Sequence, residues 1–206
     1  MVTADNFVRA ETDRYFSNIA SYAFGKLQHF RDFVPLDKVA VVRINRDTLY
    51  SVGVFDLDAG PVTVTLPDAG KRYISLVAYN EDQYASPAIY KAGSYTFTRE
   101  QLGTRYAVLG IRMLFNPADE KDRQQAHALQ DTISTRQDGR GSFAVPAWDP
   151  ASLKRVRNAL FELGKTVPDS RGMFGSREQV EPVRRLVGAA VAWGGNQEKD
   201  TLYLNV

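Results

Sequence analysis

Asn45, Arg46 and Asp47 form a polar block inside the apolar, strand-like stretch "VVRINRDTLYSVGVFDLD". Alternate residues of a strand share a face, so Arg43, Asn45 and Asp47 would lie together on one side of it. Ile44 and Arg46 would lie on the other side. An arginine beside a carboxylate and an amide can hold an anionic or hydroxylated ligand through charge-assisted hydrogen bonds. This block is the first candidate for a binding site.

The same block has two structural interpretations. In the first, it is a turn whose Asn45 and Asp47 side chains hydrogen-bond to the backbone. In the second, Asp47 pairs with Arg46 or Arg43 inside the protein and braces the sheet, with no ligand involved. The sequence leaves the three alternatives open.

A second polar stretch, "YNEDQY", places Asp82 between the aromatic residues Tyr79 and Tyr84. Binding loops use this mixture because the aromatic faces are rigid and the polar groups adapt to a ligand. A plain connection between strands could have the same composition. We predict one binding set from the two stretches: Arg43, Asn45, Arg46, Asp47, Tyr50, Tyr79, Asp82 and Tyr84.

Metal and cofactor motifs are weak in this sequence. Asp56 and Asp58 have a spacing that can hold a divalent ion or divide acid and base roles. Because the turn sequence Ala-Gly-Pro follows them, we expect both carboxylates to be solvated at a strand end. His29 and His127 have no second ligand at the spacing of zinc sites. There is no cysteine and no glycine-rich phosphate loop, so we predict neither a metal nor a cofactor.

No residues have the context of a known catalytic motif, so catalytic residues are left unassigned. We predict a β-sandwich module that binds a small molecule or carbohydrate without catalysis. The alternative is a hydrolase or lyase in which Asp47 or His29 acts as general base. Arg46 would then stabilise the developing negative charge.

The composition limits the partners. The chain has 206 residues and a net charge of +2, which is too small for the clustered basic face of a nucleic-acid-binding protein. No apolar run approaches the roughly 18 residues that cross a bilayer. We therefore predict one domain, with no nucleic-acid or membrane partner. The N-terminal sequence lacks a signal-peptide pattern, which favours the cytoplasm; removal of a leader would instead imply the periplasm or the exterior.

The order of elements predicts an α+β fold. Helical spacing of apolar residues between positions 3 and 30 predicts a long helix in an N-terminal segment, 1–34. Between residues 38 and 116 the period changes to two, in at least six strand-like runs joined by short turns. Short connections favour antiparallel pairing, so we predict an antiparallel β-sandwich, Ig-like or jelly-roll-like.

Two or three helices are expected between residues 118 and 195. Asp149 as N-cap and Pro150 at the first helical position mark the start of one of them. For the last helix, Ser176 and Gln179 have capping-box spacing, whereas Pro182 offers a later start. A final strand is expected at 200–206.

Four segments carry a resemblance to a known family: "NRDTLYSVGVFDLDAGPVTVTLPDAGKRYISL", "GTRYAVLGIR", "LQDTIS" and "WGGNQEKDTLY". They are similar to parts of the bacterial and archaeal family called domain of unknown function 1254 (DUF1254). The resemblance implies a β-sandwich with flanking helices, and it implies no activity, substrate or cofactor. Many relatives continue into a second β-domain, whereas this chain resembles a single-domain member. Its last strand would then have a free edge, from which we predict a homodimer.

Overall fold

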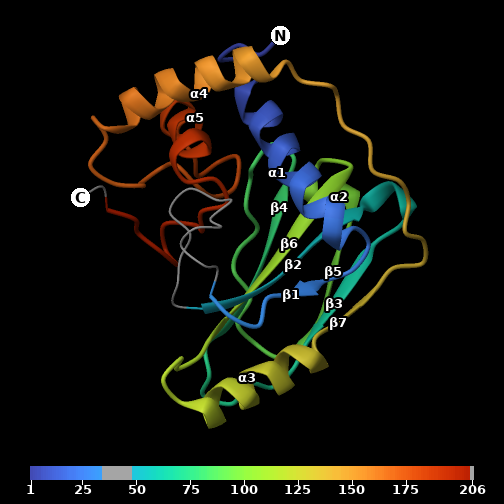
Figure 1. Cartoon of the computed structure of the whole chain (residues 1–206). Coiled ribbons are helices and arrows are strands. Elements are labelled where there is room, and N and C mark those ends of the chain that lie inside the picture. The colour runs from blue at the N-terminus through green and yellow to red at the C-terminus, as the bar shows by residue number, and fades with distance from the viewer. Residues whose placement is uncertain (34–47, 205–206) are drawn as a thin grey trace.

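The computed structural model describes residues 1–33 and 48–204, and it contains two antiparallel sheets (Figure 1). The four-stranded sheet has the order β1-β2-β6-β4, and the three-stranded sheet has the order β5-β3-β7. The strands of the first sheet are β1 Gln28–His29, β2 Thr48–Asp56, β6 Tyr106–Leu114 and β4 Ile74–Asn80. Those of the second are β5 Gly93–Phe97, β3 Val62–Leu66 and β7 Ser134–Arg136. The antiparallel α+β sandwich expected from the short turns is confirmed.

The four-stranded sheet is covered on both faces. One face of β4 and β6 presents residues such as Leu76, Leu109 and Ile111 to the core shared with the smaller sheet. The other face presents Val77 and Val108 to a second cluster that includes residues of α1. Because both faces are covered, every residue of β4 is buried and the strand has apolar residues on both faces.

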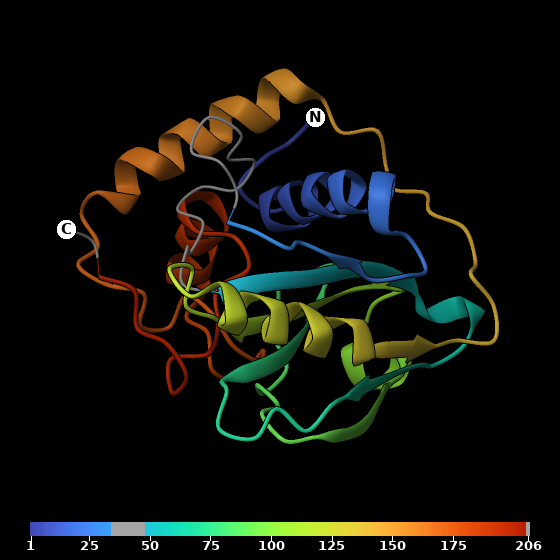
Figure 2. The ribbon, with the colours of Figure 1, turned by 60° about the horizontal axis from the view of Figure 1, so that its bottom comes forward.

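The helices lie at two places around the sheets. Helix α1 (Phe7–Ala23) packs on β2 and contacts α4 (Pro150–Gly164) and α5 (Pro182–Val191), as Figure 2 shows. These three helices bury a core of their own, with Leu153, Phe174 and Val187 among its members. Helix α3 (Glu120–Thr132) lies at the opposite end of the molecule (Figure 1). The short helices are α2 (Arg99–Leu102) and η2 (Leu57–Ala59).

The first helix is shorter than its apolar spacing suggests. It ends at Ala23, and Gly25 then takes a left-handed conformation with φ +64°. The chain next crosses β2 so closely that a Cβ atom on Gly53 would lie 2.2 Å from the carbonyl oxygen of Lys26. Residues 28–29 can therefore pair with β2 as β1, and the helix expected up to residue 30 was wrong at its C-terminal end.

The other helix boundaries follow their capping residues. The Asp149 side chain accepts a hydrogen bond of 2.8 Å from the Ser152 amide at the start of α4, as predicted. Helix α5 starts at Pro182, the later of the two expected positions. Helix α3 ends at Thr132, and β7, which the sequence did not predict, follows at once. The strand expected at 200–206 is a single bridge between Asp169 and Leu204 in its described part.

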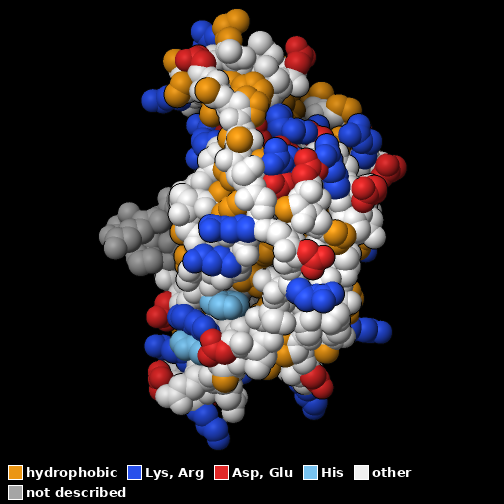
Figure 3. Space-filling model, turned by 90° about the vertical axis from the view of Figure 1, so that its right-hand side faces the viewer, with side chains coloured by type: hydrophobic (Ala, Val, Ile, Leu, Met, Phe, Trp, Pro, Cys, Tyr) orange, Lys and Arg blue, Asp and Glu red, His pale blue; other side chains and the backbone are white. Residues whose placement is uncertain are grey.

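Charged side chains are mixed on the surface. On the face drawn in Figure 3, lysine and arginine side chains lie among acidic ones and form no continuous basic surface. No helix in the described part of the chain is long and apolar enough to cross a bilayer.

Candidate functional site

Arg112 lies on the face of the four-stranded sheet that is turned away from the smaller sheet. The strand register pairs it with Tyr50 of β2 on one side and with Ser75 of β4 on the other. Its guanidinium carbon lies 5.5 Å from the centroid of the Tyr50 ring. It also donates a hydrogen bond of 3.4 Å from Nη2 to the carbonyl oxygen of Gly194. Antiparallel pairing thus places a cation beside an aromatic ring and a buried serine.

A glycine makes room for a second tyrosine on this face. Tyr79 belongs to β4 and pairs with Val108, while Gly110 lies between Val108 and Arg112 on the same side of β6. A Cβ atom on Gly110 would lie 3.6 Å from Cε2 of Tyr79, so the ring lies over the glycine. The Tyr79 hydroxyl lies near Arg112 and donates a hydrogen bond of 2.9 Å to Oδ1 of Asn196.

The last segment of the chain completes the cluster. Asn196 is 3% exposed, and its backbone amide donates to the Tyr203 hydroxyl at 3.4 Å. The backbone of Tyr203 is held in turn by Ser170, which donates its amide to the Tyr203 carbonyl and accepts the Tyr203 amide on Oγ. We call Tyr50, Tyr79, Arg112, Asn196 and Tyr203 the Arg112 centre.

The charge of Arg112 has no carboxylate partner among residues 1–33 and 48–204. Burial by itself would lower the pKa of Arg112, but the oxygens of Tyr79, Tyr50 and Tyr203 outweigh it and raise the pKa. Burial keeps the pKa of Tyr79 above its usual value, so this phenol is neutral at pH 7. Among residues 1–33 and 48–204, only dipoles and ring faces therefore surround the guanidinium at neutral pH. An arginine cannot lose its charge in this setting, and a charge that leaves water needs an anion nearby.

The segments that carry the family resemblance meet at this arginine. Tyr50 comes from "NRDTLYS", Arg112 from "GTRYAVLGIR", and Asn196 and Tyr203 from "WGGNQEKDTLY". They are far apart in the sequence, and the fold brings them into one cluster.

The predicted binding set is divided by the structure. Tyr50 and Tyr79 belong to the Arg112 centre, whereas Asp82 and Tyr84 line a cleft elsewhere, beside α1 and α5. The remaining four residues, Arg43, Asn45, Arg46 and Asp47, lie outside the described residues. Sequence reasoning missed Arg112, Asn196 and Tyr203, and the only signal for them was their presence in the quoted family segments.

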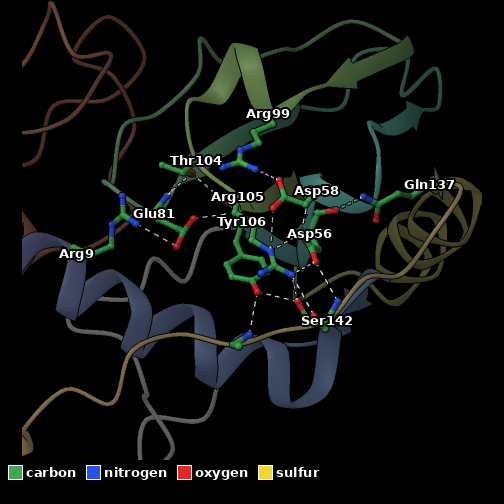
Figure 4. Close-up of polar contacts among 11 residues, drawn as sticks. Arg9, Asp56, Asp58, Glu81, Arg99, Thr104, Arg105, Tyr106, Gln137 and Ser142 are labelled. Carbon is green, nitrogen blue, oxygen red and sulfur yellow. Dashed lines mark hydrogen bonds and ion pairs between the residues drawn. The ribbon is translucent and has the colours of Figure 1, made fainter.

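A second polar network holds the opposite end of β6, and Figure 4 shows its contacts. Asp56 is 1% exposed and accepts hydrogen bonds from Arg105, at 3.0 Å from Nε and 2.8 Å from Nη2. It also accepts the backbone amides of Asp58 and Ser142, both at 3.1 Å. Burial would raise the pKa of Asp56, but these hydrogen bonds together lower it. The solvated strand end expected for Asp56 was therefore wrong.

Asp56 is buried because it fastens a long loop to the sheet. The loop that precedes α4 passes Asp56 at Ser142, and the Tyr106 hydroxyl accepts the Ala144 amide and donates to the Ser142 carbonyl. Asp58 pairs with Arg99 but stays 37% exposed at its side chain. A fully hydrogen-bonded, ion-paired carboxylate remains ionised and has no spare lone pair for acid or base chemistry. We therefore interpret this network as a structural brace.

His29, the alternative general base, is half-buried and hydrogen-bonded. Its Nδ1 atom lies 2.7 Å from Ser51 Oγ, and Gln130 of α3 donates to the same oxygen at 3.3 Å. Burial, with Arg31 nearby, lowers the pKa of His29. Ser51 is 1% exposed and alternates with Tyr50 along β2, so this pair lies on the face opposite the Arg112 centre. Within the described part of the chain, no three His, Asp or Glu side chains form a group that could hold a metal ion.

The sheets and helices together define an α+β sandwich protein. The model of the family described as "Protein of unknown function (DUF1254)" matches residues 24–137, and the chain belongs to this family. No curated protein matches the sequence.

Two solved structures of uncharacterised proteins are similar to this one. The VPA0106 protein from Vibrio parahaemolyticus has a TM-score of 0.71 at 16% identity, over 93% of this chain and 65% of that one. An uncharacterised protein from Burkholderia cenocepacia has a TM-score of 0.39 at 10% identity, over 91% of this chain and 48% of that one. The first similarity shows a shared fold. The chain spans less than two thirds of the length of either protein.

Proposed function

We propose that the Arg112 centre binds the carboxylate of a small hydroxylated molecule, such as a sugar acid, and does not transform it. The observation that carries this proposal is a guanidinium that meets no carboxylate among the described residues. A carboxylate matches the planar fork of an arginine and would supply the missing negative charge.

The surrounding residues favour a hydroxylated ligand. Tyrosine rings offer flat apolar faces, and their hydroxyl groups with the Asn196 amide both donate and accept hydrogen bonds. Tyr73 and Tyr90 extend this aromatic character, with ring centroids 5.9 Å apart, and Tyr90 donates to Asp200 at 2.6 Å. Since no nucleophile or free general base is present among these groups, we propose binding and not catalysis.

The Asn45–Arg46–Asp47 block precedes Tyr50 by only a few residues in sequence. We keep the prediction that it contributes to the same site. Its rival is that Asp47 serves as an internal partner for an arginine. Replacement of Asp47 by Asn separates the two, because loss of an internal partner lowers stability whereas loss of a ligand contact lowers affinity only.

The test compares glucuronate with glucose, which differ by the carboxylate, using isothermal titration calorimetry and thermal shifts. We expect glucuronate to bind wild type and glucose not to, and Arg112→Met to lose binding. Arg155→Met removes an exposed charge from α4 and is the matched control. Equal responses to the two sugars, or equal glucuronate binding by wild type and Arg112→Met, would contradict the proposal.

We also keep the homodimer as a proposal. The side chains of Leu202 and Leu204 in the last segment are 42% and 64% exposed, and pairing of two copies would cover them. Light scattering at micromolar concentration should give twice the chain mass, and a monomeric mass would reject the dimer.

A further inference from the structure

A second group of arginines lies outside the Arg112 centre, in an open cleft at the N-terminal ends of α1 and α5. The cleft has a volume of about 310 Å³. Its charged and aromatic lining residues are Asp5, Arg9, Asp82, Tyr84, Arg177 and Arg185. The lining thus carries three arginines and two carboxylates, and Arg9 also pairs with Glu81.

The turn that forms one wall is rigidly built. Asn80 is 6% exposed, and its Oδ1 accepts the amides of Asp82 at 3.0 Å and Tyr84 at 2.9 Å. Between them, Gln83 takes a left-handed conformation with φ 62°, which is uncommon for a residue with a side chain. The positions of Asp82 and Tyr84 are therefore fixed by the fold before any ligand arrives.

Arg9 is hydrogen-bonded to the carboxylates of this turn. It donates two hydrogen bonds to Asp82 Oδ1, at 2.7 and 3.1 Å, and one of 3.3 Å to Glu81. Its charge, and that of Asp82, are thus largely neutralised by each other.

The other two arginines both lie over the Tyr84 ring, and neither forms an ion pair with a carboxylate among the described residues. Their guanidinium carbons lie 5.0 Å (Arg177) and 4.4 Å (Arg185) from the ring centroid. Arg185 donates from Nη2 to the Asp82 carbonyl, but its buried Nε has no hydrogen-bond partner within the described ranges. Burial lowers the pKa of Arg185, and the charges of Arg177 and Arg9 lower it further, while Tyr84 and the Asp82 carboxylate oppose them in part. The cleft thus holds two cations in an arrangement that an anion would relieve.

We propose that Arg177 and Arg185 bind a phosphate group in this cleft. Two arginine guanidinium groups beside one aromatic ring match a doubly charged oxyanion. The volume exceeds that of phosphate alone, so the organic part of a phosphate ester also fits. This site is independent of the proposed function, because none of its residues belongs to the Arg112 centre.

The test measures binding of inorganic phosphate and of glucose 6-phosphate to the full chain by calorimetry in low-salt buffer. We expect saturable binding by wild type, and a loss of affinity of about tenfold or more in both Arg185→Gln and Arg177→Gln. Arg177 is exposed, so its variant keeps the test valid if Arg185→Gln fails to fold. Arg155→Gln removes the same charge from the surface of α4 and should change affinity by less than about twofold.

Tighter binding of the sugar phosphate would identify a phosphate ester as the ligand class, and equal affinities would identify free phosphate. Arg112→Met should keep full phosphate affinity, even if the carboxylate site proves wrong. Absence of saturable binding in wild type, an equal loss in Arg155→Gln, or loss of binding in Arg112→Met would overturn the proposal.

Discussion

Arg105 directly precedes β6 and Arg112 lies near the end of this strand, and the two arginines differ in their partners. Arg105 forms a bidentate ion pair with buried Asp56, and the carboxylate also accepts two backbone amides. Arg112 meets tyrosines and a carbonyl group, and no carboxylate in the described part of the chain. The fold neutralises the charge of Arg105, whereas no carboxylate among the described residues neutralises that of Arg112.

The difference separates stability from function. A buried pair with both partners present is costly to break, because the remaining charge loses its compensation. A buried charge without a partner destabilises the fold, so its removal costs little and can even help. Proteins accept such charges at sites that bind a ligand of opposite sign.

The largest effect is expected at the paired end of β6. Asp56→Ala should lower the free energy of unfolding by about 3 kcal/mol, because it leaves Arg105 and two backbone amides without their acceptor. Urea denaturation measures this loss. Asp58→Ala is the control: its carboxylate is partly exposed, so the loss should stay below about 1 kcal/mol. Equal losses in the two variants would show that burial of Asp56 is not what makes its pair strong.

The same pair should give a pH signature. The pKa of Asp56 is lower in the folded state than its ordinary value near 3.9, so its stabilisation is complete above about pH 4. It is lost as the pH falls through the folded-state pKa. The stability difference between wild type and Asp56→Ala should therefore shrink in acid, and a constant difference down to pH 2 would contradict the ion-pair account.

Asp13 is a buried acidic residue that can be compared with Arg112. It is 1% exposed, accepts a hydrogen bond of 2.7 Å from Trp148, and has a buried Oδ1 without a partner in the described part of the chain. Burial raises its pKa to about 6, so the protonated form is favoured in the folded protein. The stability that the raised pKa of Asp13 provides is fully present below about pH 4, and it is lost as the pH rises through 6.

Asp13→Asn should therefore raise stability at pH 7 by about 2 kcal/mol and remove the decline between pH 4 and 6. The amide oxygen can still accept the Trp148 hydrogen bond. Denaturation midpoints at several pH values measure both effects. A less stable variant at pH 7 would mean that the ionised carboxylate is compensated within the fold.

A smaller effect is expected at Tyr79, which lies beside Arg112. Tyr79→Phe removes the buried hydrogen bond to Asn196 and should lower stability by about 1 kcal/mol. It should also weaken glucuronate binding, because the hydroxyl group lies beside Arg112. Tyr95→Phe removes an exposed tyrosine hydroxyl that donates to the Lys91 carbonyl, and it should change neither quantity. Unchanged stability and affinity in Tyr79→Phe would remove Tyr79 from the site.

Much of the fold could be predicted from local patterns. Neighbouring residues determine the alternation of β3, the short turns and the helix start at Asp149-Pro150. The structure contains each of these features. The end of α1 and strands β1 and β7 were missed because contacts with β2 and β3, far along the chain, decide them. A left-handed glycine at position 25 was the one local sign of the early helix end.

The candidate site was only half predictable. Tyr50 and Tyr79 were named because of their polar neighbours in sequence, yet what joins them is Arg112, which sits in an apolar run and reads as a strand residue. The residues that surround Arg112 are set by the strand register and by the fold of residues 193–203. Asp56 was misjudged for the same reason, since its burial depends on a loop more than eighty residues away.

The most direct measurement is the urea denaturation of Arg112→Met beside Arg105→Met, in one buffer without added carboxylates. We predict that Arg105→Met lowers the free energy of unfolding by about 2–4 kcal/mol, because it leaves the buried Asp56 carboxylate without its cation. Arg112→Met should change the free energy of unfolding by less than about 1 kcal/mol. An equal loss in Arg112→Met would show that the chain itself neutralises this charge. The Arg112 centre would then be a second brace and not a binding site.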